Sequence, residues 1–181
     1  HRGAGRGQLT DTVHICQRPA QAEDRAVPGH WQGDLLLGKR MSSIATLVER
    51  SSRFTMLVQL ERINSETVVT ALAEHVLTLP DQLRRSLTWD QGKEMARHRS
   101  FTIDTGAQSY FCDPNSPWQR GSNEHTNGLL RQYFPKRVAD FRDYTQTDLD
   151  AVAAERNGRP RKTPEFVTPS DKFNEAVALT R

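Results

Sequence analysis

Three acidic residues in different local settings could support metal-dependent chemistry. Asp34 lies in the apolar segment GDLLLG, Asp90 follows the short apolar run LTW, and Glu124 opens the helix-like segment NEHTNGLLRQYF. Hard cations such as Mg²⁺ prefer oxygen ligands, and proteins commonly hold them with a few carboxylates, water and substrate phosphates. A carboxylate-held pair of such ions can promote in-line displacement at phosphorus. The pattern therefore favours phosphodiester chemistry.

The same acids also have simpler explanations. Asp34 could satisfy turn amides at a strand end, Asp90 could cap the segment after its strand, and Glu124 could stabilise a helix N-terminus through the helix dipole. The chain has 22 acidic residues, so spacing alone does not separate these explanations from a metal site.

The elements that must position these acids can be predicted from hydrophobic periodicity. From His30 onward, three short apolar runs predict an antiparallel meander. Asn64 precedes a helical pattern that ends near Pro80, and strands are predicted over 85–89 and 108–112, with helical composition over 93–99 between them. This order predicts an α/β fold with a mixed five-stranded sheet, three antiparallel strands followed by parallel additions, flanked by helices.

Two further helices have clear start signals after the helix that carries Glu124. Thr145 with Asp148, and Thr168 with Asp171, match the capping-box spacing. On the Glu124 helix, Asn127, Gly128 and Arg131 share the face of Glu124, whereas Leu129, Leu130 and Tyr133 are predicted to form the packing face.

Composition predicts a single soluble intracellular domain. The chain has 181 residues, 35% of them hydrophobic, and lacks both a long apolar run and a basic-then-apolar leader. We predict a leader or linker over residues 1–29 and a core with C-terminal helices over 30–181. The two cysteines lie in unlike contexts, so a structural disulfide is not expected.

Basic charge clusters near and after Glu124. The net charge is only +3, but there are two groups of four basic residues: the first, over 118–137, contains one acid, Glu124, and the second, over 156–162, contains none. They are Arg120, Arg131, Lys136 and Arg137, and then Arg156, Arg159, Arg161 and Lys162. A solvated basic face is the ordinary explanation, and a polyanionic partner is the alternative that a nearby metal-type acid set favours.

Four long segments resemble one known family. They are RPAQAEDRAVPGHWQGDLLLGKR, LTWDQGKEMARH, YFCDPNSPWQRGSNEHTNGLLRQYFPK and NGRPRKTPEFVTPSDKF. Together they are similar to the catalytic core of bacterial insertion-sequence transposases of the IS-thirty type, which belong to the DDE transposase and retroviral-integrase group. The resemblance runs from about Arg18 to about Val177 and implies a ribonuclease H-like fold.

The resemblance also implies an activity and its residues. Asp34, Asp90 and Glu124 correspond to the catalytic, metal-binding acids, with 33 residues (91–123) between the last two. The implied cofactor is Mg²⁺, with Mn²⁺ as a substitute and two ions in the site, and the implied reaction is the cutting and joining of DNA phosphodiesters. The candidate DNA contacts are Arg120, Asn123, Asn127, Arg131, Lys136, Arg159, Arg161 and Lys162. For Asn123, Asn127 and Arg131, capping and surface solvation are equally open roles.

The implied partners are double-stranded DNA, both element ends and target, and further copies of the chain in a homo-oligomer on that DNA. No membrane is implied, and the expected location is the bacterial cytoplasm, in association with the nucleoid. Neither the element-end and target sequences nor the oligomeric state can be predicted from the chain.

Several positions depart from the family pattern. Gln32 stands where an acid is usual, His125 where Asn is usual, and Arg156 where an apolar residue is usual; Arg137-Val138 and Pro164-Glu165 also differ. Gln32 is predicted on the same strand face as Asp34, so an acid near the metal site is lost. The family's N-terminal DNA-reading region has no counterpart here, which suggests an excised core or a truncated copy. A non-catalytic DNA-binding or oligomerisation module, and a nucleic-acid hydrolase, are therefore alternative functions.

Overall fold

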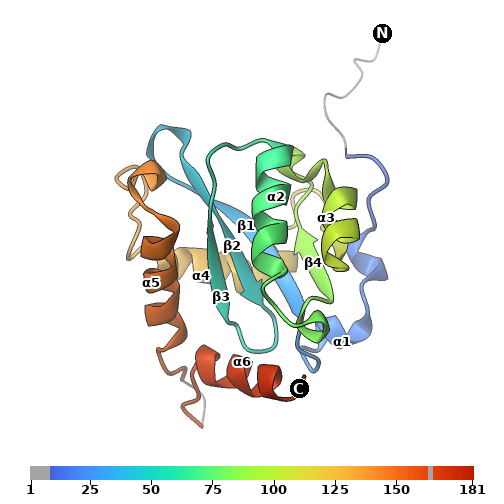
Figure 1. The fold of residues 1–181 in the computed structure, drawn as a ribbon. Helices are drawn as coiled ribbons and strands as arrows, with labels where there is room; N and C mark the ends of the chain where they lie inside the picture. The colour runs from blue at the N-terminus through green and yellow to red at the C-terminus, as the bar shows by residue number, and fades with distance from the viewer. Residues whose placement is uncertain (1–8, 163–164) are drawn as a thin grey trace.

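A five-stranded sheet forms the centre of the computed structural model, which describes residues 9–162 and 165–181 (Figure 1). The strand order is β3-β2-β1-β4-β5. β1 pairs antiparallel with β2, and β2 with β3, whereas β4 joins β1 and β5 joins β4 in parallel. The strands are β1 (His30–Leu37), β2 (Ser43–Glu49), β3 (Thr55–Gln59), β4 (Ser86–Trp89) and β5 (Gln108–Phe111). The predicted fold class is confirmed.

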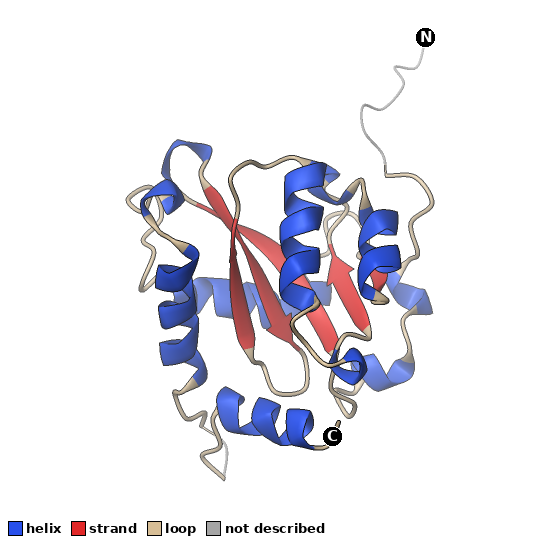
Figure 2. Ribbon diagram, viewed as in Figure 1, coloured by secondary structure: helices blue, strands red, loops and turns tan. Residues whose placement is uncertain are grey.

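Helices cover both faces of this sheet (Figure 2). The helices are α1 (Ala20–Glu23), α2 (Ser65–Val76), α3 (His98–Thr105), α4 (Gly121–Leu130), α5 (Gln146–Asn157) and α6 (Pro169–Ala178). Short 3₁₀ turns lie at Ile15–Gln17, Lys39–Met41, Asp81–Leu83, Lys93–Met95, Pro117–Arg120 and Phe141–Asp143. In Figure 1, α2 and α3 lie in front of the sheet and α4 crosses behind it.

The alternation of side chains along the strands separates two hydrophobic cores. On β2, Ala45 and Leu47 join the core under α2 and α3, whereas Ile44 joins a smaller core with Leu130 of α4 and Leu149 of α5. On β1, Asp34 lies two residues before Leu36, so both side chains point to the same face of the sheet. Leu36 belongs to this smaller core, so the β1 face that carries Asp34 is the face under α4.

Helix α5 lies along the outer edge of β3. The Gln146 side chain accepts from Gln59 N at 2.8 Å and donates to Leu57 O at 2.7 Å, and the Asn157 side chain accepts from Thr55 N at 2.9 Å and donates to Thr55 O at 2.8 Å. Side-chain amides thus satisfy backbone groups that an edge strand would otherwise leave open.

Helix α6 packs against the larger core through Phe173 and Ala176. Phe173 stacks on Phe54, with ring centroids 4.2 Å apart, and contacts Trp31 edge-on at 5.9 Å. Such aromatic pairs add to the stabilisation that comes from area burial. This packing keeps the start of α6 close to the turn between β2 and β3.

In its described part, residues 9–29, the segment before β1 packs against the rest of the molecule and is not a free leader. Arg18 is buried and donates to Thr88 at 3.1 Å, Ala22 is fully buried, and its carbonyl accepts from Arg50 at 2.7 Å. His14 also forms a parallel bridge with Phe111 at the edge of β5. These contacts join residues far apart in sequence, which local composition cannot reveal. Residues 1–8 of the predicted leader, and Pro164, lie outside the described residues.

Local helix-start predictions are confirmed. Asn64 accepts from Thr67 N at the start of α2, and both predicted capping boxes, Thr145 with Asp148 and Thr168 with Asp171, are present. Cys16 and Cys112 are both free thiols. Among the described residues, none of the helices has the length and apolarity required to cross a bilayer.

Candidate functional site

Asp34 lies within β1 and faces α4. Its Oδ1 accepts from Leu35 N at 2.9 Å, and its Oδ2 accepts from the Asn127 amide of α4 at 3.2 Å. Burial raises the pKa of the Asp34 carboxyl, and the nearby Arg120 guanidinium opposes that rise. Asp34 is thus a partly buried carboxylate held between a strand and a helix.

Asp90 lies at the end of the neighbouring parallel strand. Gln32 on β1 pairs with Thr88 on β4, and two residues further along each chain come Asp34 and Asp90. Parallel strands end at the same edge of a sheet, so the two carboxylates point into the same region. Asp90 Oδ1 accepts from Gly92 N at 3.0 Å, which is the local capping contact that the simpler explanation predicts.

Arg120 lies between these two aspartates. Its Nη1 is 3.0 Å from Asp34 Oδ1, and its Nη2 is 3.5 Å from Asp90 Oδ2. The Arg120 side chain is 13% exposed, against 26% for Asp34 and 42% for Asp90. Burial lowers the pKa of Arg120, but the two aspartates outweigh it and the pKa is raised. Arg120 was predicted as a DNA contact; in the structure it is an internal counter-ion.

The contacts of Arg120 leave part of the guanidinium unsatisfied. Its Nε and Nη1 are buried and lack an aligned hydrogen-bond acceptor within the described part of the chain, so the contact with Asp34 is mainly an ion pair. Two carboxylates facing one cationic group are a donor set that suits a hard divalent cation. The Arg120 guanidinium therefore occupies the position, between Asp34 and Asp90, that such a cation would take.

Glu124 does not join the two aspartates in a metal-type cluster. Its side chain is exposed on α4, and across residues 9–162 and 165–181 no three His, Cys, Asp or Glu side chains are arranged to hold one ion. The structure thus brings two of the three predicted acids to one point. The third lies on the helix whose Asn127 already contacts Asp34.

Polar contacts fix α4 against the sheet. Asn123 is fully buried, and its side-chain amide donates to Gln32 O at 3.1 Å and Thr46 O at 3.3 Å. Thr46 Oγ1 in turn donates to Asn127 at 2.9 Å. Asn123, predicted as a DNA contact, instead supports the helix, because its position is inaccessible to a large ligand.

The predicted packing face of α4 is confirmed for Leu130 and Tyr133, which join the smaller core, but it is incomplete. The buried residues of α4 are Ser122, Asn123, Thr126 and Leu130, so the first two turns pack through polar side chains. Thr46 is the partner that sequence reasoning missed. Its signal is a polar residue inside the apolar run IATLV, two positions after Ile44 and thus on the same strand face.

Gln32 connects β1 to the start of α4. It is 1% exposed, its Oε1 accepts from Asn123 N at 3.2 Å, and its Nε2 donates to Gln119 O at 3.4 Å. The residue that replaces the family's usual acid therefore has both a donor and an acceptor in use.

We expect Gln32→Glu to lower the free energy of unfolding by about 1–3 kcal/mol, because a buried carboxylate would face the Gln119 carbonyl without a proton to donate. Urea denaturation at neutral pH measures the change. Gln132→Glu, at an exposed position just after α4, is the matched control and is expected to be neutral. Equal stability of both variants would contradict the connecting role of Gln32.

The other predicted DNA contacts lie in three places. Arg131 donates to Leu37 O at 3.0 Å, which joins the end of α4 to the end of β1. Lys136 is exposed, and Arg159 contacts Glu155 at 2.6 Å and lies 5.5 Å over the Tyr133 ring. Arg161 and Lys162 line a pocket next to α4. The structure therefore does not gather these residues around Asp34 and Asp90.

Comparison with known proteins places this chain in a family. The integrase core domain family matches residues 24–117. The chain is 54% identical over 172 residues to the transposase InsI for insertion sequence element IS30A of Escherichia coli K12, covering 95% of this chain and 45% of that protein. It is 46% identical over 174 residues to the transposase for IS1086 of Cupriavidus metallidurans, covering 96% and 51%. The chain thus spans about half the length of these curated relatives.

Solved structures show the same fold. The catalytic core domain of BIV integrase superposes with a TM-score of 0.63 at 18% identity, covering 83% of this chain and 97% of that one. A chain of the simian T-cell lymphotropic virus intasome, in complex with a PP2A regulatory subunit, matches with a TM-score of 0.64 and covers 92% of this chain. At these identities the likeness concerns the fold alone.

Proposed function

Because this chain belongs to the integrase core domain family, we propose that it is the catalytic core of a transposase that cuts DNA and joins the resulting ends to a target. The observation that carries the proposal is the convergence of Asp34 and Asp90 on one cationic group. Similarity to insertion-sequence transposases over nearly the whole chain supports it.

The proposed cofactor is Mg²⁺, with Mn²⁺ as a substitute, and two ions in the complete site. Divalent cations activate an attacking oxygen and stabilise the departing one at phosphorus. Asp34 and Asp90 are the residues that would hold the first ion, since both already face a cation. Glu124 is the proposed third acid, and its helix is connected to Asp34 through Asn127.

Arg120 has two proposed positions in this scheme. In the metal-free chain it neutralises the two aspartates, and in the loaded chain its guanidinium is released toward a DNA phosphate, which it can contact through two parallel hydrogen bonds. The same side chain therefore competes with the metal before the reaction and binds DNA during it.

We expect Arg120→Gln to raise the affinity for Mn²⁺ by roughly tenfold, because a positive charge close to both carboxylates is removed. Isothermal titration calorimetry without DNA measures this directly. Arg62→Gln, at an exposed position in the loop before α2, is the control for a lost charge alone. Unchanged or weaker Mn²⁺ binding by Arg120→Gln would remove the competition between Arg120 and metal.

The proposed partners are double-stranded DNA, both element ends and target, and further copies of the chain assembled on it. Lys136, Arg159, Arg161 and Lys162 are proposed phosphate contacts, since their charged groups lie at or near the surface. The proposed place of action is the bacterial chromosome in the cytoplasm.

A strand-joining assay tests the proposed function. Purified chain is mixed with Mn²⁺ and a labelled element-end duplex that carries a free 3′-hydroxyl, together with a target duplex. Joined strands support the transposase core. Shortened strands without joined product would indicate a hydrolase instead, and DNA binding without carboxylate-dependent Mn²⁺ binding would indicate the non-catalytic module. The exposed position of Glu124, outside any three-acid cluster of the described residues, is what keeps that module as the second candidate.

A further inference from the structure

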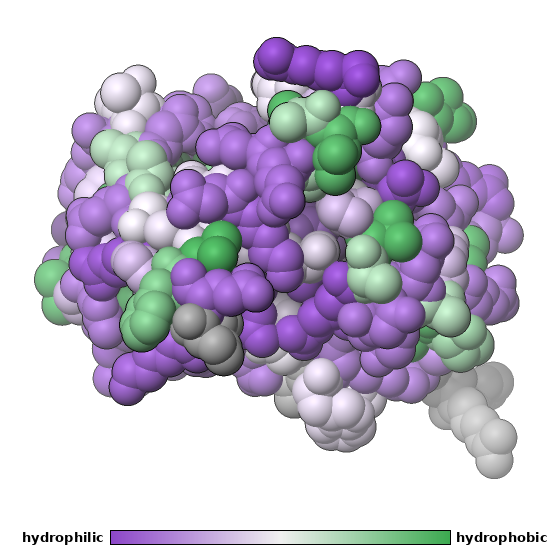
Figure 3. Space-filling view, turned by 90° about the horizontal axis from the view of Figure 1, so that it is seen from below, coloured by the Kyte–Doolittle hydropathy of each residue, from purple (hydrophilic) through white to green (hydrophobic). Residues whose placement is uncertain are grey.

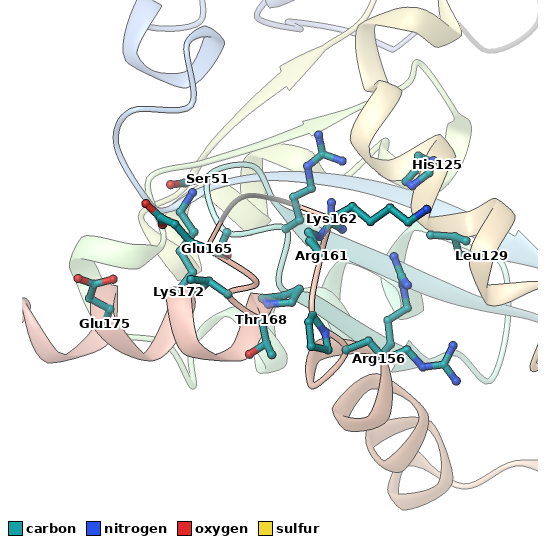
Figure 4. Close-up of a pocket in the computed structure, with 16 residues that line it drawn as sticks. Ser51, His125, Leu129, Arg156, Arg161, Lys162, Glu165, Thr168, Lys172 and Glu175 are labelled. Carbon is teal, nitrogen blue, oxygen red and sulfur yellow. The ribbon is translucent and has the colours of Figure 1, made fainter.

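A basic pocket lies on the side of α4 away from the central aspartates. Its volume is about 690 Å³. The walls come from the turn between β2 and β3, from His125 and Leu129 of α4, from the end of α5 with the segment after it, and from the start of α6 (Figure 4). The face of the molecule seen in Figure 3 is predominantly hydrophilic.

Cations outnumber acids on the walls of this pocket. The lining acids are Glu165 and Glu175, and the lining lysines and arginines are Arg53, Arg156, Arg159, Arg161, Lys162 and Lys172. Arg159 is neutralised by Glu155, outside the pocket. The remaining cations leave an excess of positive charge in one concave site, which favours an anionic ligand.

The arginines in the pocket also destabilise one another's charged forms. Burial and the neighbouring Arg53 and Arg156 lower the pKa of Arg161 to about 10, and burial lowers that of Arg156 too. The Nε of Arg156 is buried and lacks a hydrogen-bond acceptor among the described residues. A bound anion would supply that acceptor and relieve the repulsion.

Three of the positions that depart from the family pattern, His125, Arg156 and Glu165, line this pocket. His125 on α4 and Arg156 on α5 are far apart in sequence, yet both line it. Arg156 adds a positive charge and Glu165 a negative one, whereas burial and then the neighbouring arginines lower the pKa of His125, so its imidazole is mainly neutral at pH 7.

The neighbouring elements indicate the class of anion. Guanidinium groups present several donors in one plane, which suits the oxygens of a phosphate. On α4, Asn127 contacts Asp34 while His125 and Leu129 line the pocket, so about one helix diameter, roughly 10 Å, separates the pocket from the aspartates. A DNA backbone places phosphates at intervals that can span this distance within a few nucleotides.

We propose that this pocket binds backbone phosphates of the DNA strand on which the aspartates act, with Arg156, Arg161 and Lys162 as the principal contacts. The proposal rests on the proposed function, because it takes DNA as the substrate. It adds a defined anchoring site on the other side of α4 from the two aspartates, which would fix the strand before any metal is bound.

The test compares DNA binding by the full chain without divalent metal. For the double variant Arg156→Gln/Arg161→Gln, fluorescence anisotropy with a short duplex is expected to show at least about tenfold weaker DNA binding. The slope of log K against log salt concentration is expected to become shallower by about two, near 0.9 for each lost phosphate contact. Arg62→Gln/Arg99→Gln removes the same charge at exposed positions outside the pocket and is expected to lose much less. Equal losses in the two double variants would overturn the proposal.

Two further measurements keep the outcome unambiguous. Thermal unfolding of the pocket variant is expected at or above the wild-type temperature, because mutual repulsion is removed; if it fails to fold, Lys162→Gln, at an exposed position, replaces it in the comparison. Inorganic pyrophosphate is titrated into both proteins. If the variant loses pyrophosphate binding but keeps wild-type DNA affinity, the pocket takes a free phosphate compound and the DNA assignment is overturned.

Failure of this proposal differs from failure of the proposed function. A chain that joins strands while its pocket variant matches the control has the transposase activity without the anchoring site. A chain that never joins strands, yet shows the pocket-dependent loss of DNA affinity, has the anchoring site without the transposase activity.

Discussion

Asp90→Asn is expected to reduce strand joining by roughly a hundredfold or more, since changing groups that only orient metal ligands already costs 10- to 100-fold. Asp90 and Asp34 contact the same Arg120 guanidinium, so Asp90 supplies one of the two carboxylates that are proposed to hold the first metal ion. The joining assay with Mn²⁺ measures the rate, and calorimetric titration of Mn²⁺ is expected to show a parallel loss of affinity.

The same substitution is expected to leave the fold intact. The Asp90 side chain is 42% exposed, and the contact from Gly92 N to its Oδ1 can also be made by the Asn carbonyl oxygen. The control is Asp104→Asn, an exposed acid of α3 outside the site, which is expected to keep full activity. Joining that is equally fast in Asp90→Asn and in wild type would exclude Asp90 from the metal site.

Gly33→Ala is expected to give the largest loss of stability, about 2–3 kcal/mol in the free energy of unfolding. A Cβ at Gly33 would overlap the ring of Trp89 and lie 3.2 Å from Leu47 Cδ2. Trp89 is fully buried, and its indole donates to Glu94 at 2.9 Å, so the ring cannot move without loss of packing and of this hydrogen bond. Thermal and urea unfolding measure the change.

Gly33→Ala should also affect the metal site, because Gly33 precedes Asp34 and Trp89 precedes Asp90. A displaced Trp89 ring would shift the second aspartate relative to the first, so weaker Mn²⁺ binding is expected along with the lower melting temperature. Gly128→Ala is the matched control: an added Cβ at this helical position meets nothing within 4 Å, and alanine should raise stability slightly. Equal stability of the two variants would contradict the packing argument for Gly33.

Sequence reasoning predicted the local features and the family-level fold well. Capping boxes such as Thr145 with Asp148 are confirmed because three-residue spacing alone specifies them. The pairing of the first three strands is confirmed because short apolar runs joined by tight turns have few other arrangements. These features depend on contacts close in the chain.

The features that sequence reasoning missed depend on distant contacts. The pairing of Arg120 with Asp34 and Asp90 was not predicted, because a lone arginine in the sequence carries no sign that two distant aspartates surround it. Asn123 was predicted to lie on the helix surface, because the sequence does not show that Gln32 and Thr46 of the sheet lie beneath it. Glu124 lies outside a three-acid cluster among the described residues, so its role as the third metal-binding acid stays a prediction of the family resemblance.

The contacts at the two edges of the sheet affect how copies of the chain can assemble. The Gln146 and Asn157 amides of α5 bond to the backbone of β3, and His14 bridges to Phe111 of β5. Along the described part of the chain, the edge of β3 has side-chain partners at Thr55, Leu57 and Gln59, and the edge of β5 has a backbone partner at Phe111. A second copy would therefore have to displace these contacts before it could extend the sheet. The proposed oligomers should accordingly form through helices and loops, and the chain should resist the edge-to-edge pairing by which exposed strands aggregate.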